Sequence, residues 1–216
     1  MQYDPSKRLG SNFYSRNAKV VAQKLLGCKL VVRRGDRVLS GWIVETEAYL
    51  DREDPACHAA RGMTRSNATM FGPAGLLYVY TIHSKYCMNV VTGGDGSGQA
   101  VLIRALEPID GIDLMEANRG SWVPRDLARG PSRLCQALDI DRTWDGTNLL
   151  DDDRIWIEPP LETHRPRLRI ARSERIGITK AEEYLLRFFI DGNMFVSGRV
   201  GSHSRPTISR LTRPPA

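Results

Sequence analysis

Two β-forming runs lie on either side of a very short break at Gly35-Asp36. The segments CKLVVRR and VLSGWIVETEAYL flank this break, and both are rich in β-branched residues. So short a connection can join only antiparallel neighbours, because a parallel crossover needs about a dozen residues or more. The pair therefore directs the chain toward a sheet of hairpin-joined, mostly antiparallel strands.

The rest of the chain alternates further strand patterns with helical ones. LLYVYTI and YCMNVV predict a second hairpin around His83-Ser84-Lys85, and VLIRALEP, RIWIEP, RLRIARS and RFFIDG predict later strands. Apolar spacing predicts a helix over 12–27 and shorter helices in IDGIDLMEANRG and GPSRLCQALDI. No linker marks a boundary, so we expect one α/β (α+β) domain over 1–216, with a core at about 12–198 and a basic tail at 199–216.

The cysteines do not suggest a metal knuckle. The chain has 216 residues and is 41% hydrophobic, enough for a full core without covalent cross-links. Two disulfides stay possible, but buried free thiols are the favoured prediction because the four cysteines are widely separated and form no CxxC. They are Cys28, Cys57, Cys87 and Cys135.

Charge and hydropathy narrow the class of partner. No apolar run approaches the roughly 18–20 residues of a membrane span, and the N-terminus lacks the apolar stretch of a signal peptide. We therefore expect an intracellular protein, cytoplasmic in a bacterium or nuclear in a eukaryote, with no membrane partner. The net charge of +6 attracts phosphate, which makes nucleic acid a candidate partner.

Against this basic background, the stretch 44–58 concentrates acid at the end of a strand. Glu47 would lie beside an aromatic ring on that strand, where it could act as a general base or simply belong to a solvent-exposed face. Strand alternation predicts two faces. One holds Trp42, Val44, Thr46, Ala48 and Leu50 as core, and the other holds Ile43, Glu45, Glu47 and Tyr49.

Other polar residues interrupt apolar strands. Arg104 needs a carboxylate partner if it is buried, and Glu47 or Glu107 could supply it. A structural salt bridge would explain it equally well. Tyr78 and Tyr80 share a strand face and are either core or the walls of a slot for a flat aromatic ligand.

Three further patterns are weaker. Asn89 lies on the return strand, where a side-chain amide could read the edge of a ligand. His58 ends the acidic loop and could contact a heterocycle or lie at the surface. ARGPSRLCQAL resembles an anion site, in which Arg129 and Arg133 flank the start of a helix.

Taken in order, several segments resemble the alkyladenine (3-methyladenine) DNA glycosylase family. They are VETEAYL, LLYVYTIHSKYCMNVV, VLIRALEP, LARGPSRLCQALDI, RIGI and RFFIDGNMFVSG, and the resemblance covers about 12–198. It implies a single domain built on a curved antiparallel sheet, with surrounding helices and a protruding hairpin that enters DNA. It also implies a monomer that binds double-stranded DNA with damaged purines and uses no metal or other cofactor.

The resemblance assigns roles to individual residues. Glu47 matches the general base that deprotonates the attacking water, and Arg104 and the carbonyl of Val196 match the groups that hold this water. The pocket that stacks and reads the flipped base corresponds to Tyr49, His58, Tyr78 and Tyr80, with Asn89 as the obstacle to the amino group of guanine.

The hairpin tip departs from the family pattern. A tyrosine wedge followed by Gly-Met-Tyr is usual there, whereas this chain has His83 at the wedge position, followed by Ser84, Lys85 and Tyr86. Tyr86 could replace His83 as the wedge. With Arg129 and Arg133, the residues His83, Lys85 and Tyr86 form the predicted DNA-contacting set.

The resemblance, with these residues, implies a monofunctional DNA glycosylase. It would flip alkylated or deaminated purines out of the duplex and hydrolyse the N-glycosidic bond with a water activated by Glu47, at the start of base excision repair. No lysine stands in the ETEAY strand to act as an amine nucleophile. Two alternatives stay open: a non-catalytic protein that binds nucleic-acid shape on the same fold, and a metal-dependent hydrolase using Glu47, Asp54 and His58.

Overall fold

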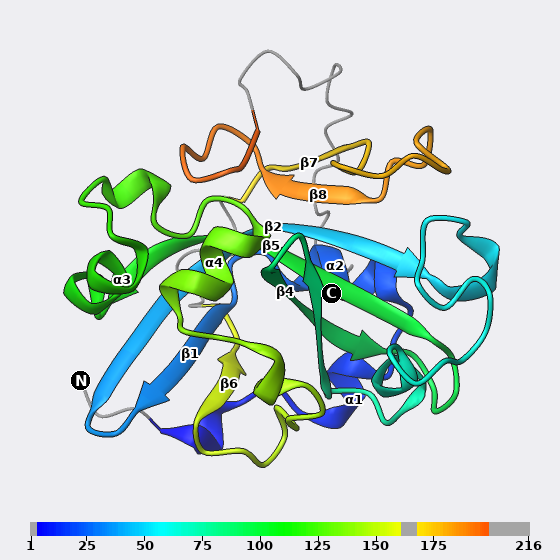
Figure 1. Ribbon diagram of the computed structural model, residues 1–216, viewed down its shortest axis with the longest axis horizontal. Helices are drawn as coiled ribbons and strands as arrows, with labels where there is room; N and C mark the ends of the chain where they lie inside the picture. The colour runs from blue at the N-terminus through cyan, green and yellow to red at the C-terminus, as the bar shows by residue number, and fades with distance from the viewer. Residues whose placement is uncertain (1–3, 161–167, 199–216) are drawn as a thin grey trace, which may run out of the picture.

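An eight-stranded sheet forms the centre of the molecule in the computed structural model, which describes residues 4–160 and 168–198 (Figure 1). Every pairing between its strands is antiparallel, which confirms the sheet type expected from the hairpins. The main order is β3-β4-β5-β2-β1-β6, and β8 joins both β2 and β7. The strands are β1 (Lys29–Arg34), β2 (Arg37–Leu50), β3 (Leu77–Ile82), β4 (Lys85–Thr92), β5 (Gln99–Asp110), β6 (Ile155–Glu158), β7 (Ile170–Ser173) and β8 (Arg187–Ile190).

Strand β2 organises this sheet because it has three neighbours. Along one edge it pairs with β5 from Ser40 to Leu50. Its other edge is divided, with β1 pairing up to Trp42 and β8 pairing from Glu45 to Glu47. The sheet curls at this division, so that β7 and β8 form a separate layer over β2 and β5 (Figure 1). The second half of β2 is therefore enclosed on both edges.

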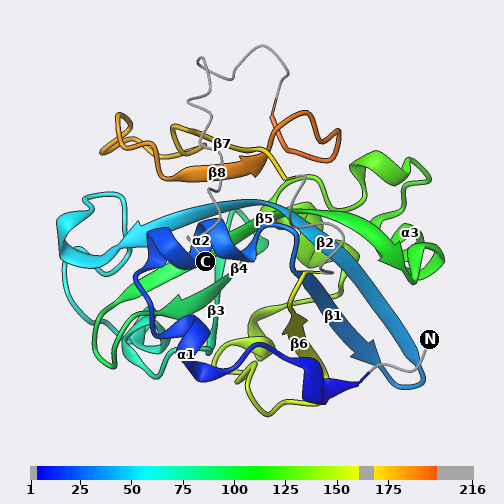
Figure 2. The same cartoon turned by 180° about the vertical axis from the view of Figure 1, so that it is seen from behind.

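In the described part of the chain, four α-helices and several short 3₁₀ helices surround the sheet, which gives an α+β domain. Helix α2 packs along β2, on the side seen in Figure 2, and the hydroxyl of Thr46 donates to the carbonyl of Ala22 across that contact at 2.9 Å. The α-helices are α1 (Ser11–Tyr14), α2 (Ala18–Leu25), α3 (Ile112–Arg119) and α4 (Pro131–Ala137). The 3₁₀ helices are Pro5–Lys7, Asp51–Glu53, Ala68–Phe71, Pro124–Asp126 and Arg142–Trp144.

The single helix predicted over 12–27 is wrong. It is divided into α1 and α2, because the side chain of Asn17 accepts a hydrogen bond from the backbone N–H of Lys19 at 2.9 Å and so begins a new helix. Asparagine favours this N-cap position because it satisfies an amide that the helix leaves free. The two later helices begin and end where their Pro131 and Gly120 signals indicate.

The single core face predicted for β2 is also wrong. Val44 packs with Ala105 and Phe189 under the β7–β8 layer, whereas Ala48 lies in the main core beneath α2. The register between β2 and β5 shifts at Ile43/Glu45 and again at Glu45/Thr46. Such an irregularity interrupts the strict alternation of faces, and a sequence pattern of period two cannot reveal it.

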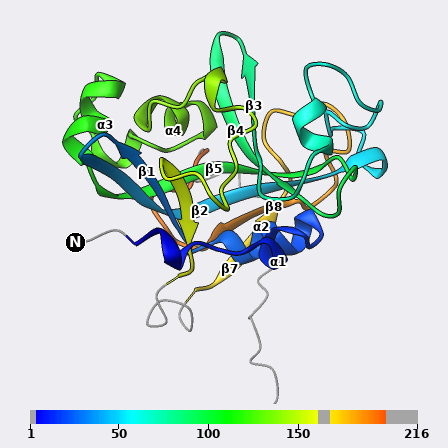
Figure 3. The same ribbon diagram turned by 90° about the horizontal axis from the view of Figure 1, so that it is seen from below.

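The β3–β4 hairpin projects from the sheet beside α4 (Figure 3). Its turn consists of His83 and Ser84 alone, because Ile82 already pairs with Lys85. Both turn residues have positive φ, 45° and 60°. This left-handed backbone is what a two-residue hairpin turn of the common type demands. The predicted hairpin is confirmed, with Lys85 belonging to the strand.

The main core is apolar and lies between the sheet, α2 and α4. All four cysteines are buried and free, as expected. Among the residues described here, no helix has the length and apolar character needed to cross a membrane. The predicted basic tail at 199–216 lies outside the described residues.

Candidate active site

A pocket of about 540 Å³ opens beside the second half of β2. Its size falls within the range of about 300–1,000 Å³ typical of small-molecule sites. Strands β2, β3, β4 and β5, the 55–61 loop, the start of α4 and the 176–180 segment all contribute to its walls. Six of the residues predicted from the sequence line it: Tyr49, His58, Tyr78, Tyr80, Asn89 and Arg104.

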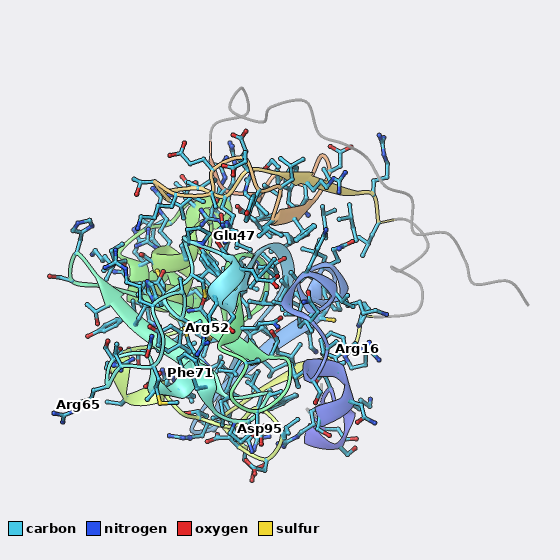
Figure 4. The ribbon with its side chains drawn as sticks, turned by 90° about the vertical axis from the view of Figure 1, so that its right-hand side faces the viewer. Arg16, Glu47, Arg52, Arg65, Phe71 and Asp95 are labelled. Carbon is cyan, nitrogen blue, oxygen red and sulfur yellow. The ribbon has the colours of Figure 1, made fainter. Side chains whose placement is uncertain are left out.

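Glu47, labelled in Figure 4, lies in the second half of β2 and is fully buried. Its Oε2 accepts from the hydroxyl of Tyr49 at 3.0 Å. Its Oε1 accepts from the backbone N–H of Ile176 at 2.8 Å and lies 3.1 Å from Nη1 of Arg104. All three partners line the pocket. The carboxylate is thus in the interior, and the alternative of a solvent-exposed strand face is wrong.

One acceptor site on the Glu47 carboxylate stays available. Two carboxylate oxygens offer about four lone-pair sites, and the two hydrogen bonds use one on Oε2 and one on Oε1, while the ion pair with Arg104 lies on the Oε1 side. The second lone pair of Oε2 is used by no contact among the described residues, although Glu47 is separated from the pocket by the residues that line it.

Aromatic side chains form the opposite side of the pocket. The rings of Tyr78 and Tyr80 stack with centroids 5.6 Å apart, and the ring of His58 packs edge-on against Tyr80 at 4.6 Å. His58 Nδ1 lies 2.9 Å from the hydroxyl of Tyr78. These contacts hold the three rings as one rigid wall, against which a flat aromatic group can stack.

Burial keeps this aromatic wall uncharged at neutral pH. It raises the pKa of Tyr78 to about 12 and raises the pKa of Tyr80 further. The pKa of the Tyr49 hydroxyl is raised by burial and then by the neighbouring Glu47 carboxylate. Burial also lowers the pKa of His58, which favours the neutral imidazole. The pocket therefore presents phenols and a neutral ring.

Asn89 is held at the pocket by its own strand pair. Its Nδ2 donates to the carbonyl of Tyr78 at 3.0 Å, and the side chain is buried. This bond fixes the orientation of the amide and leaves its oxygen as the atom that is free to meet a ligand.

A buried ion-pair network behind Glu47 was not predicted. Glu45 Oε1 binds Nε of Arg104 at 2.8 Å and Nε of Arg187 at 2.7 Å, and its Oε2 accepts from the backbone N–H of Ser197 at 2.6 Å. Burial opposes ionisation of Glu45, but the two guanidinium groups outweigh it and lower its pKa. Arg104 therefore bridges Glu45 and Glu47, and the predicted pairing with Glu47 is confirmed. Glu107 instead accepts from Asn193.

Arg175, Arg187 and the backbone N–H of Ile176 were also not predicted from the sequence. The only signal for Arg187 was its place at the start of an apolar strand, where a buried base requires an acid. The N–H of Ile176 has no sequence signal, because any residue except proline carries a backbone N–H.

The loop residue Asn67 binds the carbonyl of His58 at 2.9 Å, while the nearby Arg65 lies at the outer edge of the molecule (Figure 4).

The remaining predicted residues lie outside the pocket walls. His83 and Lys85 are exposed at the hairpin tip, whereas Tyr86 is half-buried against the main core. Arg129 donates from Nε to the carbonyl of Val196 and from Nη2 to that of Gly198, both at 2.8 Å.

The predicted anion site and the metal-hydrolase alternative can each be compared with the positions of their residues. The exposed Arg133 lies 3.5 Å from Asp126. Within residues 4–160 and 168–198, no group of three or more histidine, cysteine, aspartate or glutamate side chains is placed to hold a metal ion. Asp54, one of the acids in the metal-hydrolase alternative, instead binds Arg175 through both carboxylate oxygens.

Comparison with known proteins connects this site to one family. Residues 12–194 match the family described as methylpurine-DNA glycosylase. A protein of Rhodopirellula baltica named "Putative 3-methyladenine DNA glycosylase" is 47% identical over 213 residues, which cover 95% of this chain and 90% of that protein. Proteins of the same name from Methanoculleus marisnigri and Carboxydothermus hydrogenoformans are 48% and 45% identical. Each alignment covers 88% of this chain, and 99% and 98% of the relative.

Proposed function

Since the chain belongs to the methylpurine-DNA glycosylase family, we propose that it removes 3-methyladenine and related damaged purines from double-stranded DNA. The enzyme is a hydrolase of the N-glycosidic bond and acts as a monomer. One observation carries this proposal: the buried carboxylate of Glu47 is bonded to three residues that line a ring-walled pocket.

The pocket accepts the base after it leaves the duplex. A base inside the helix cannot reach a buried group, so the nucleotide rotates out at a cost of a few kcal/mol. A purine alkylated on a ring nitrogen is cationic and stacks well on the electron-rich rings of Tyr78 and Tyr80. The neutral His58 adds no opposing charge. This favours a damaged purine over a normal one before any bond is broken.

Glu47 then acts on the sugar side of the base. The C1′–N bond breaks, and its electron pair leaves with the purine, which neutralises an alkylated base. The sugar cation that develops is stabilised by the carboxylate. A water held at the free lone pair of Oε2 attacks C1′, and Glu47 takes its proton. Arg104 balances the charge of the carboxylate, and no cofactor enters any step.

Deaminated purines such as hypoxanthine are proposed as a second class of substrate. They carry no charge in the pocket, so stacking and the hydrogen bonds of the flat ring bind them. When the C1′–N bond of such a base breaks, the purine leaves as an anion and takes a proton from water. Asn89 limits which purines fit, because its fixed amide oxygen repels an acceptor and its bulk obstructs an amino group at the base edge.

The surface around the pocket suits a DNA duplex. Arg61 and Lys180 line its rim and are exposed, so both can reach phosphate oxygens. Ile82 also lines the pocket and is 44% exposed, beside His83 at the hairpin tip. We propose that this tip fills the space left by the extruded nucleotide. We also propose that the carbonyl of Val196 helps to hold the attacking water. The side chains that contact DNA are those of Lys85, Arg129 and Arg133.

A Glu47→Gln variant tests the proposal and separates it from the non-catalytic alternative. Glutamine keeps the shape of the side chain but cannot take a proton, so excision of hypoxanthine from a duplex should fall by about 10²–10⁴-fold. Glu53→Gln is the matched control, because Glu53 is an exposed acid in the following loop. A Glu47→Gln enzyme with the excision rate of the unchanged protein would refute the proposed role.

A further inference from the structure

A buried ion pair between Asp54 and Arg175 lies next to the pocket. Both side chains are fully buried, and Nη2 of Arg175 binds Oδ1 of Asp54 at 2.7 Å while Nη1 binds Oδ2. Nη1 also donates to the carbonyl of Ala48 in β2 at 3.1 Å. A charge pair removed from water so completely is costly unless its hydrogen bonds are well formed, so its geometry is closely defined.

The guanidinium of Arg175 reaches two groups of the site. Its central carbon lies 4.7 Å from the centre of the Tyr49 ring, within cation–π range. The next residue, Ile176, donates its backbone N–H to Oε1 of Glu47. Arg175 thus sets the position of the phenol that binds one oxygen of Glu47 and of the amide that binds the other.

Asp54 connects the same pair to the loop that carries His58. Its carboxylate accepts from the backbone N–H of Leu50 at 3.2 Å and from that of Ala56 at 3.1 Å. These two bonds fix the direction in which the loop leaves the end of β2. The second of them is at Ala56, two residues before His58. One ion pair joins three separate parts of the pocket: the end of β2, the 54–58 loop and the 175–176 segment.

We propose that Asp54 and Arg175 are positioning residues that aim the carboxylate of Glu47 and the ring of Tyr49 at the bound purine nucleotide. The inference rests on the proposed function. Neither residue touches the reacting atoms. Both act by fixing the donors on Glu47, and so the orientation of its carboxylate beside the pocket. A displacement of about 1 Å at such a group can reduce a rate by about 10²-fold.

An Arg175→Lys variant separates positioning from charge. Lysine keeps the cation but lacks the planar fork that binds both oxygens of Asp54 and covers the Tyr49 ring. The single-turnover rate of hypoxanthine excision should fall at least about tenfold. Affinity for a duplex that carries an abasic analogue should change less than about threefold, since that ligand has no base for the pocket to hold.

Lys29→Gln is the matched control for stability. Lys29 and Glu158 form a pair between β1 and β6, with Nζ 3.2 Å from Oε2 and most of both side chains buried. The control should lower the melting temperature and leave the excision rate unchanged. If Arg175→Lys lowers only the melting temperature, or lowers excision and abasic binding equally, the positioning role is refuted.

Asp54→Asn decides the question if Arg175→Lys does not fold. It is isosteric, but its single side-chain oxygen can accept from only one of the two backbone amides, and it loses the charge that binds Arg175. The same loss of rate without loss of binding is expected. Full excision by this variant would overturn the inference. Absence of excision by the unchanged protein would instead refute the proposed function, so the two failures are distinguishable.

Discussion

Nη1 of Arg104 lies 3.1 Å from Oε1 of Glu47, and both side chains are buried. The same guanidinium binds Glu45, which in turn holds Arg187 and the backbone of Ser197. The group that we propose as the base is therefore part of a connected network of buried charges. Stability and reactivity depend on the same contacts there.

Removing the shared cation should destabilise the fold. Arg104→Gln leaves two buried carboxylates with less positive charge, and breaking a buried pair in this way costs roughly 3–5 kcal/mol. Urea unfolding of the variant measures the loss. Arg133→Gln is the control, because Arg133 is half-exposed and its contact with Asp126 should contribute less than about 1 kcal/mol. Equal stabilities of the two variants would contradict the network.

At the hairpin tip, one substitution should change the stability of the protein and another should change its affinity for DNA. His83 and Ser84 both adopt positive φ, which residues other than glycine and asparagine avoid. Ser84→Gly should therefore raise the free energy of unfolding by about 0.5–1 kcal/mol. His83→Ala should weaken affinity for a lesion duplex while leaving thermal stability nearly unchanged. Unaltered affinity would exclude His83 as the wedge, and since Tyr86 is half-buried, it would direct attention to Ile82.

Asn89 should control which purines are excised. Its fixed amide occupies one side of the pocket, so Asn89→Ala should raise excision of guanine relative to hypoxanthine. The change also removes the hydrogen bond from the side chain to the carbonyl of Tyr78, at a cost of about 0.5–1.5 kcal/mol in stability. Competition assays with matched duplexes measure the ratio. Cys87→Ala, which enlarges the same pocket without removing an amide, should leave the ratio unchanged.

His58 gives the site a defined dependence on pH. Burial lowers its pKa in the folded protein, so the unfolded chain binds more protons as the pH falls below the ordinary value of 6.5. The contribution of His58 to stability is complete above pH 6.5 and is lost as the pH falls through the lowered pKa. An NMR titration of the His58 ring should show a midpoint below pH 6.5. His58→Gln should remove this contribution to the dependence of the free energy of unfolding on pH. A midpoint above 6.5 would contradict it.

Much of the fold was predictable because hairpins are local. Turn residues and β-branched runs fixed the strand pairs β1–β2 and β3–β4, and Pro131 and Gly120 marked helix ends. The register shift near Glu45 was not predictable, because it lies where β8 joins β2 from 140 to 144 residues further along the chain. No local pattern reports such a contact.

The residues of the candidate site also fall into two groups, those that could be identified from the sequence and those that could not. Residues whose chemistry is unusual for their position, such as Glu47 and Arg104 within apolar strands, were identified from the sequence and lie together. Asp54 was interpreted only as a possible metal ligand, whereas it binds Arg175. Partners such as Arg175 and the amide of Ile176 have ordinary local sequences, and their importance arises only from tertiary contacts.

The three neighbours of β2 have a consequence for motion. The amides around Glu47 belong to a strand enclosed on both edges, so they can open to solvent only when the centre of the sheet unfolds. The carboxylate that we propose as the base is consequently held on the part of the chain that opens last. Adjustment to purines of different shape therefore falls to exposed side chains at the rim of the pocket, such as those of Arg61 and Lys180, rather than to the strand.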